Sequence, residues 1–205
     1  MFCTNCGTRI ESNQQFCTQC GARVSSNALN NNSTNTNFIN QPSQISLNVV
    51  WIMIAQKKLS LLNIITCYVI LYNDRLVLAH LSPELQKAEN AKKSAEIKAS
   101  GIGFFKGSAE MMRYWANYQD KYRTMPIPSI LAEDPMNAEI PYNIISELLF
   151  RAYTAGDEDD PDRGGVMHIS LSNGNTVKLK HTISHSNSVK ATLESLLGFR
   201  VKYKK

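Results

Sequence analysis

Four cysteines within the first twenty residues most constrain what this chain can fold into. They form two C-x-x-C pairs, each followed by glycine, at Cys3, Cys6, Cys17 and Cys20. Each pair can present two thiolates to one metal ion from a tight turn, and the following glycine allows a left-handed backbone there. Two such pairs complete a tetrahedral shell that has no room for an activated water. We therefore expect one structural zinc ion and no hydrolytic chemistry at this site.

The same cysteines could instead form two disulfides or a redox-active dithiol. The chain begins Met-Phe-Cys-Thr-Asn and shows neither the basic nor the apolar segment of a secretory signal. We therefore expect a cytoplasmic protein, because thiols stay reduced there and remain free to bind metal. Iron–sulfur binding is the alternative that stays open.

The segment around these cysteines resembles the short zinc-ribbon found at the N-terminus of many bacterial and archaeal proteins. The resemblance covers residues 2–24, where Phe2 and Phe16 each precede a cysteine pair as the family's aromatic residues do. Thr4 and Thr18 stand where the family usually has proline, a change that removes no ligand. The resemblance implies a fold and a metal, but no activity, because such ribbons are attached to many different domains.

The composition changes after the ribbon and indicates three parts. Residues 1–24 form the predicted zinc-ribbon, and residues 25–44 are uncharged and rich in Asn and Ser, which is typical of a flexible linker. Residues 45–205 are long enough for one domain with its own core. The apolar runs in this part are too short or too interrupted for a transmembrane segment.

Short apolar runs separated by turn residues predict a mainly antiparallel sheet in this larger domain. Asn73-Asp74 and Asn173-Gly174 mark two hairpin turns. The predicted strands are residues 49–55, 59–71, 75–81, 128–132, 138–151, 166–171 and 176–180.

A helical insertion at about 82–125 interrupts the predicted strands. Ser82-Pro83-Glu84 supplies an N-cap, a first-turn proline and an acidic residue near the helix N-terminus. Glycines at 100–107 predict a break, and a second helix is expected over 108–122. A last helix, expected to close the sheet, begins near Ser186 and carries an apolar face of Val189, Leu193, Leu196 and Leu197.

The domain is thus predicted to be α+β, and the order of its elements resembles bacterial PH-like and GRAM-type domains. Ile140-Pro-Tyr-Asn-Ile-Ile145 is similar to a strand entry that recurs in that family. The resemblance implies an antiparallel domain closed by a C-terminal helix, and binding of lipids, peptides or proteins. The insertion at about 82–125 departs from a compact PH barrel. No phosphoinositide site is carried over, because only Lys57 and Lys58 supply positive charge at the first hairpin.

The net charge of +5 is too small for a chain that packs nucleic acid. Acidic residues cluster at 157–162, and we expect a solvated loop there in preference to a docking patch or a calcium site. Basic residues gather near the C-terminus, on an expected exposed strand and tail, at Lys178, Lys180, Lys190, Arg200, Lys202, Lys204 and Lys205.

The remaining cysteine, the histidines and the apolar residues of the insertion can each be explained without a catalytic role. Cys67 lies in an apolar run and is expected to be buried. No acidic residue or nucleophile lies at a sequence spacing from His80, His168 or His181 that would indicate a catalytic pair. Structural roles are therefore expected for all three histidines. The apolar residues at 102–115 are either core residues or a surface for lipid or a partner helix.

No nucleophile elbow, phosphate-binding loop, catalytic carboxylate pair or open metal site is evident, so we expect no enzyme activity. The leading hypothesis is a zinc-binding adaptor that recruits protein partners, with a membrane surface as one place of action. A nucleic-acid-binding regulator is the first alternative, with Arg9, Thr18 and Arg23 near phosphates and the basic tail assisting. A peripheral lipid-binding protein is the second.

Overall fold

The computed structural model describes residues 48–156 and 161–205. All of them belong to one structural unit, Gln44–Lys205, which we call the β-domain. The four predicted zinc ligands, the predicted linker and most of the acidic run at 157–162 lie outside the described residues.

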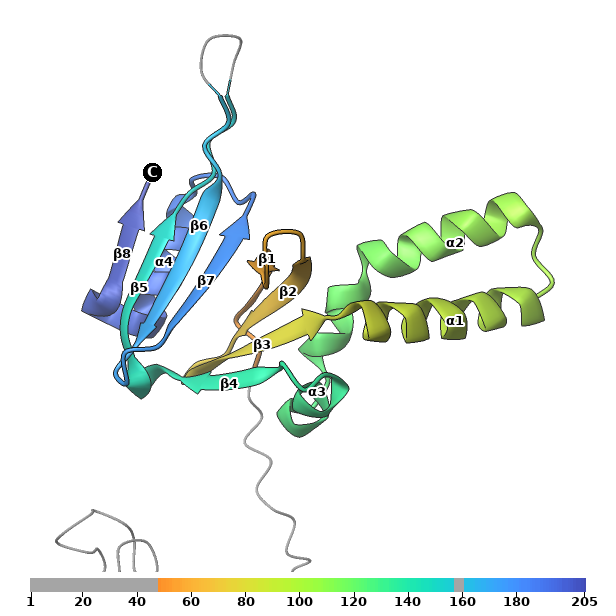
Figure 1. Cartoon of the computed structure of the whole chain (residues 1–205), viewed down its shortest axis with the longest axis horizontal. Coiled ribbons are helices and arrows are strands. Elements are labelled where there is room, and N and C mark those ends of the chain that lie inside the picture. The colour runs from red at the N-terminus through yellow and green to blue at the C-terminus, as the bar shows by residue number, and fades with distance from the viewer. Residues whose placement is uncertain (1–47, 157–160) are drawn as a thin grey trace, which may run out of the picture. The chain divides into compact units, whose positions relative to one another are not determined.

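The described residues form strands first, then the helical insertion, and then strands again (Figure 1). The strands are β1 (Trp51–Lys58), β2 (Ile64–Leu71), β3 (Arg75–Leu81), β4 (Ala138–Pro141), β5 (Ile145–Arg151), β6 (Gly165–Leu171), β7 (Thr176–His181) and β8 (Val201–Lys204). The α-helices are α1 (Pro83–Ala99), α2 (Phe104–Ala116), α3 (Ile127–Glu133) and α4 (Asn187–Leu197). Short 3-10 helices are η1 (Tyr118–Arg123), η2 (Tyr142–Ile144) and η3 (Gly198–Arg200).

The strands form one sheet in the order β4-β3-β2-β1-β7-β6-β5-β8. All neighbours are antiparallel except β5 and β8, which run parallel. β1 and β7 are paired only through Gln56 and Lys180, so the sheet divides there into two halves whose strands run in different directions (Figure 1). The predicted α+β class and the mainly antiparallel pairing are confirmed.

β2 is apolar along its length because both of its faces are covered. Cys67, Val69 and Leu71 belong to one core, whereas Tyr68 and Ile70 belong to the core on the opposite face. Successive side chains of a strand point to opposite faces, so a strand between two cores has no solvent face to mark with polar residues. The predicted hairpin with β3 is confirmed, with Leu71 opposite Leu76.

The first core lies between the two halves of the sheet and α4. Leu193 and Leu197 of α4 are buried in it, and Val189 and Leu196 pack against it in part. In Figure 1, α4 lies behind β5 and β6. The predicted closing helix and its apolar face are therefore confirmed.

The insertion forms a helical hairpin that projects away from the sheet (Figure 1). Ser82 caps α1, since its hydroxyl accepts a hydrogen bond from the Leu85 amide at 3.3 Å. α2 starts at Phe104, earlier than predicted from the glycines at 101, 103 and 107, because only the first of these three takes a positive φ, of 67°. Gly107 continues the helix and lies against α1, where a Cβ atom would stand 2.9 Å from Ile97. α2 ends at Ala116, and η1 follows it.

Three predicted strands were wrong in whole or in part. Residues 59–63 of the predicted strand 59–71 form the turn between β1 and β2, where Leu61 and Leu62 are exposed, so β2 begins only at Ile64. Residues 128–132 belong to α3, because Ile127 and Ile130, one helical turn apart, are buried against the second core. Residues 138–151 are interrupted by η2, where the Tyr142 hydroxyl donates to the Tyr72 carbonyl at 2.8 Å. The expected basic tail contains β8, whose Val201 and Tyr203 pack on the first core while the lysines between and after them face solvent.

Candidate functional site

A groove opens where β1 and β7 separate. It has a volume of about 540 Å³, which lies within the range of small-ligand pockets. Its lining comes from the end of β1, the β1–β2 turn, β6 and β7, and includes Lys58, Leu59, Leu61, Val166, His168, Lys178 and Lys180. We call it the β1–β7 groove. Its described lining contains no acidic residue.

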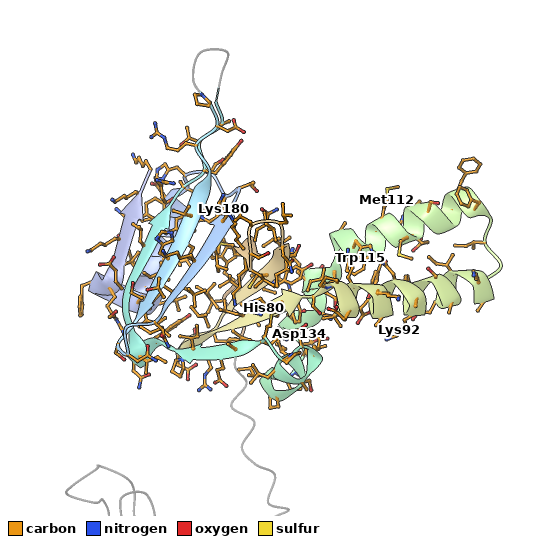
Figure 2. All side chains as sticks on the ribbon, viewed as in Figure 1. His80, Lys92, Met112, Trp115, Asp134 and Lys180 are labelled. Atoms are coloured by element: carbon orange, nitrogen blue, oxygen red, sulfur yellow. The ribbon has the colours of Figure 1, made fainter. Side chains whose placement is uncertain are left out.

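The lysines of this groove are free to meet a ligand. Lys58, Lys178 and Lys180 form no ion pair with another described residue. Leu61 is 87% exposed, and the adjacent Leu62 is 96% exposed. Figure 2 labels Lys180, the one β7 residue that pairs with β1. The groove therefore joins exposed apolar surface to unpaired positive charge.

The edge of β7 that faces β1 has backbone N–H and C=O groups that are mostly not paired with another described strand. β7 is paired along its length with β6, but toward β1 only Lys180 has a strand partner among the described residues. An extended segment could therefore add beside Thr176–Leu179, since strand addition needs an unpaired edge.

Several of the predicted basic residues near the C-terminus are already engaged. Lys190 pairs with Glu194 at 3.7 Å, and Lys202 pairs with Glu147 at 2.5 Å. The Arg200 guanidinium donates to the backbone carbonyl groups of Tyr142 and Ile145. These residues therefore do not form one continuous free basic stripe with the groove lysines.

Cys67 and His80 are brought together, a juxtaposition that the sequence analysis missed. They are register partners on β2 and β3, and both side chains are fully buried. Burial raises the pKa of the Cys67 thiol to about 12, against a weaker opposing effect of Lys57. A thiol with so high a pKa is a poor nucleophile near neutral pH. The predicted structural role of Cys67 is therefore supported.

The buried histidines predict that the β-domain loses stability in mild acid. Burial lowers the pKa of His181, and burial with nearby Lys57 lowers that of His80, below the ordinary value of 6.5. The hydrogen bond with Asn137 and the charge of Asp134 oppose the shift at His80. A depressed histidine pKa means that the unfolded chain binds more protons. Stability should therefore be full above about pH 6.5 and fall as the pH drops toward the folded pKa values.

Urea unfolding between about pH 7.5 and about pH 5, followed by tryptophan fluorescence, measures this loss. Both tryptophans of the chain, Trp51 and Trp115, lie in the β-domain. A His80→Gln/His181→Gln variant should show a smaller dependence of unfolding free energy on pH. An unchanged dependence in that variant would contradict the assignment.

The helical hairpin places its apolar residues in two environments. Tyr114 and Trp115 pack in part against the second core, and the Trp115 indole donates to Asn90 of α1 at 2.9 Å. Met112 is 69% exposed and lies on the side of α2 that faces away from α1 (Figure 2). Phe104 and Phe105, at the start of α2, are 82% and 87% exposed. The interpretation of these two phenylalanines as core residues is therefore wrong.

Neither a metal-binding cluster nor a membrane-spanning helix is present among the described residues. Residues 48–156 and 161–205 contain no cluster of three His, Cys, Asp or Glu side chains suited to a metal ion. Within the same ranges, no helix has the length and apolar character needed to cross a bilayer.

Comparison with known proteins identifies the N-terminal segment. Residues 2–24 match the family model of a zinc-ribbon domain, which confirms the resemblance seen in the sequence. Zinc binding by this segment follows from the match, and the paired cysteine thiolates are ligands that suit zinc. A search of curated proteins finds no match to the chain.

Proposed function

We propose that the protein is a non-enzymatic, cytoplasmic adaptor in which a zinc-ribbon and a PH-like domain recruit protein partners. In this proposal one structural zinc ion is held by Cys3, Cys6, Cys17 and Cys20. Four thiolates fill a tetrahedral shell, so the metal supplies stability to the ribbon and leaves recognition to the protein surface.

The PH-like assignment draws its support from the order of the elements. Seven strands follow the order β4-β3-β2-β1-β7-β6-β5, and α4 packs on the core that these strands share. The departures from a compact PH barrel are the insertion from α1 to α3 and the added strand β8. The insertion lies in the connection between β3 and the edge strand β4, and β8 adds at the opposite edge beside β5, so the order of the seven strands is kept.

The β1–β7 groove is the observation that carries the adaptor proposal. It combines exposed Leu61 with unpaired Lys58, Lys178 and Lys180 beside an unpaired part of β7. An extended partner segment with apolar and acidic side chains satisfies all three features: it can add beside β7, cover the leucine and neutralise the lysines. We infer that the groove binds a segment of this kind.

The nucleic-acid alternative draws less support from the β-domain. A protein that follows a phosphate backbone needs a continuous series of free cations. The groove supplies three lysines among apolar residues, whereas Lys190, Arg200 and Lys202 bind groups of the domain itself.

Charge reversal in the groove tests the adaptor proposal. Zinc-loaded full-length protein and its Lys178→Glu/Lys180→Glu variant would be immobilised and exposed to cell extract, with and without nuclease. Reversal of two contact charges should lower retention of specific partners by roughly tenfold or more. The matched control is Lys204→Glu/Lys205→Glu, which makes the same change of charge at the end of the chain.

Retention lost in the groove variant and kept in the control supports the proposal. A Cys3→Ser/Cys6→Ser variant shows whether the ribbon also takes part in recognition. Equal retention by the groove variant contradicts the proposed role of the groove. If nuclease removes all retained protein, the nucleic-acid alternative replaces the adaptor.

A further inference from the structure

We propose that the distal end of the α1–α2 hairpin, Lys98–Lys106, inserts into the surface of an anionic lipid bilayer. We call this segment the hairpin tip. The inference concerns a surface distinct from the β1–β7 groove, so it does not depend on the proposed function and adds a place of action to it.

The hairpin tip exposes more aromatic surface than a solvated turn needs. Phe104 and Phe105 are 82% and 87% exposed, and Ile102 is 36% exposed. The two rings contact each other edge to face, with their centroids 5.7 Å apart. Large apolar side chains that cluster on a protruding surface indicate a contact with lipid or protein.

The rest of the hairpin holds the tip in place and away from the sheet. α1 has seventeen residues and is therefore about 25 Å long. The two helices are joined near the sheet by the Trp115–Asn90 hydrogen bond and near the tip by the packing of Ile97 against Gly107. Figure 1 shows the tip as the part of the hairpin farthest from the sheet. A flat bilayer can therefore reach the two phenylalanines without meeting the sheet.

The charges of the hairpin tip match an anionic surface. Lys98 and Lys106 flank the phenylalanines, and neither forms an ion pair with a described residue. The nearest acidic residues on each side are already neutralised, since Glu96 pairs with Lys93 at 3.1 Å and Glu110 with Arg113 at 2.6 Å. Lysines near a bilayer are attracted to anionic headgroups while neighbouring aromatic rings enter the interface.

Other occupants of the hairpin tip fit these charges less well. In a symmetric pair of chains, tip against tip, Lys98 and Lys106 would face their own copies across the contact. The chain's own segment at 25–44 has no acidic residue to meet these lysines. A hollow of about 400 Å³ opens between the two helices at the tip, and its lining includes Lys98, Ile102 and Phe104. Phe105 lies outside that lining and is 87% exposed, so a ligand seated in the hollow would leave it uncovered, whereas a fluid bilayer can close around the whole tip.

Sedimentation with vesicles tests the proposal. Zinc-loaded full-length protein would be spun with vesicles of phosphatidylcholine alone, or of phosphatidylcholine and phosphatidylserine in equal parts, at low salt. We expect binding to the mixed vesicles that is roughly tenfold or more stronger than to phosphatidylcholine alone. Phe104→Ser/Phe105→Ser and Lys98→Gln/Lys106→Gln should each weaken it by about tenfold or more.

Phe199→Ser is the matched control, because Phe199 is 96% exposed at a different place in the domain. Its vesicle binding should equal that of the unmodified protein. All variants change exposed side chains, and an unchanged thermal unfolding curve checks that each is folded. Absence of binding to mixed vesicles, or equal binding by the Phe104→Ser/Phe105→Ser variant, overturns the proposal. So does a dimer of the unmodified protein that this variant dissociates, since the occupant is then a second copy.

The groove variant Lys178→Glu/Lys180→Glu separates this inference from the adaptor proposal. If only the adaptor proposal fails, the tip variants still lose vesicle binding. If only the membrane inference fails, partner retention still depends on the groove lysines.

Discussion

A Cys17→Ser substitution is expected to abolish zinc binding by residues 2–24 and to leave the thermal unfolding of the β-domain unchanged. Structural zinc contributes about 10 to 16 kcal/mol to the folding of small zinc fingers near neutral pH. A segment as short as the ribbon cannot bury enough apolar surface to replace this contribution. Zinc released to a colorimetric chelator measures the metal, and the dispersion of N-terminal amide signals in an NMR spectrum measures folding of the ribbon.

Cys67→Ala is the matched control for this experiment. Cys67 is buried in the first core of the β-domain, so its replacement should lower the unfolding temperature. Bound zinc should stay unchanged. Zinc retained by the Cys17→Ser protein, or N-terminal amides that stay dispersed, would contradict the assignment of the metal site.

Phe150→Ala is expected to cost the β-domain about 3 to 5 kcal/mol of unfolding free energy. Phe150 is fully buried on β5 and stacks between two rings. Its centroid lies 4.4 Å from that of His181 on β7 and 5.4 Å from that of Tyr203 on β8. Removal of the ring leaves a cavity where three strands and the core meet. Because domains of this size have unfolding free energies of about 5 to 15 kcal/mol, the loss is a large fraction of the total.

Phe199→Ala provides the comparison for Phe150→Ala. The same side chain is removed from a position that is 96% exposed, so the unfolding free energy should change by about 0.5 kcal/mol or less. Urea unfolding followed by tryptophan fluorescence measures both variants. Equal destabilisation by the two substitutions would show that Phe150 is not part of the core that we describe.

The parts of the fold that the sequence predicted well are those in which local signals and packing agree. The Asn173-Gly174 turn and the Ser82 N-cap are signals for one local structure, and the apolar run of β2 is rich in β-branched side chains, which favour a strand. The apolar face of α4 likewise has a helical period that a strand does not share. For these elements the sequence signal alone was sufficient.

The elements that were missed depend on contacts far along the chain. Residues 128–132 are short and rich in apolar side chains, and their helical form depends on burial of Ile130 against the second core. The lysines of β8 predict a solvated tail, whereas the alternation of Val201 and Tyr203 with those lysines is the period of a strand with one face toward a core.

The candidate sites show the same limit. The spacing of Cys3, Cys6, Cys17 and Cys20 is a local pattern, so the ribbon was recognised from the sequence. The β1–β7 groove combines the end of β1 and the turn after it with the β6–β7 hairpin, more than a hundred residues further along the chain, and no local pattern brings these two segments together. The exposure of Phe104 and Phe105 follows from the projection of the hairpin, which composition does not reveal.

Site-specific photo-crosslinking from the groove tests the adaptor proposal most directly. A photoreactive amino acid would replace Leu61 in the groove or, as a control, Phe199, and the crosslinked peptides would be identified by mass spectrometry. We predict partner protein segments rich in acidic and apolar residues at Leu61, and their loss when Lys178→Glu/Lys180→Glu is added. Crosslinks that are the same from both positions, or that go to nucleic acid alone, would contradict the proposal.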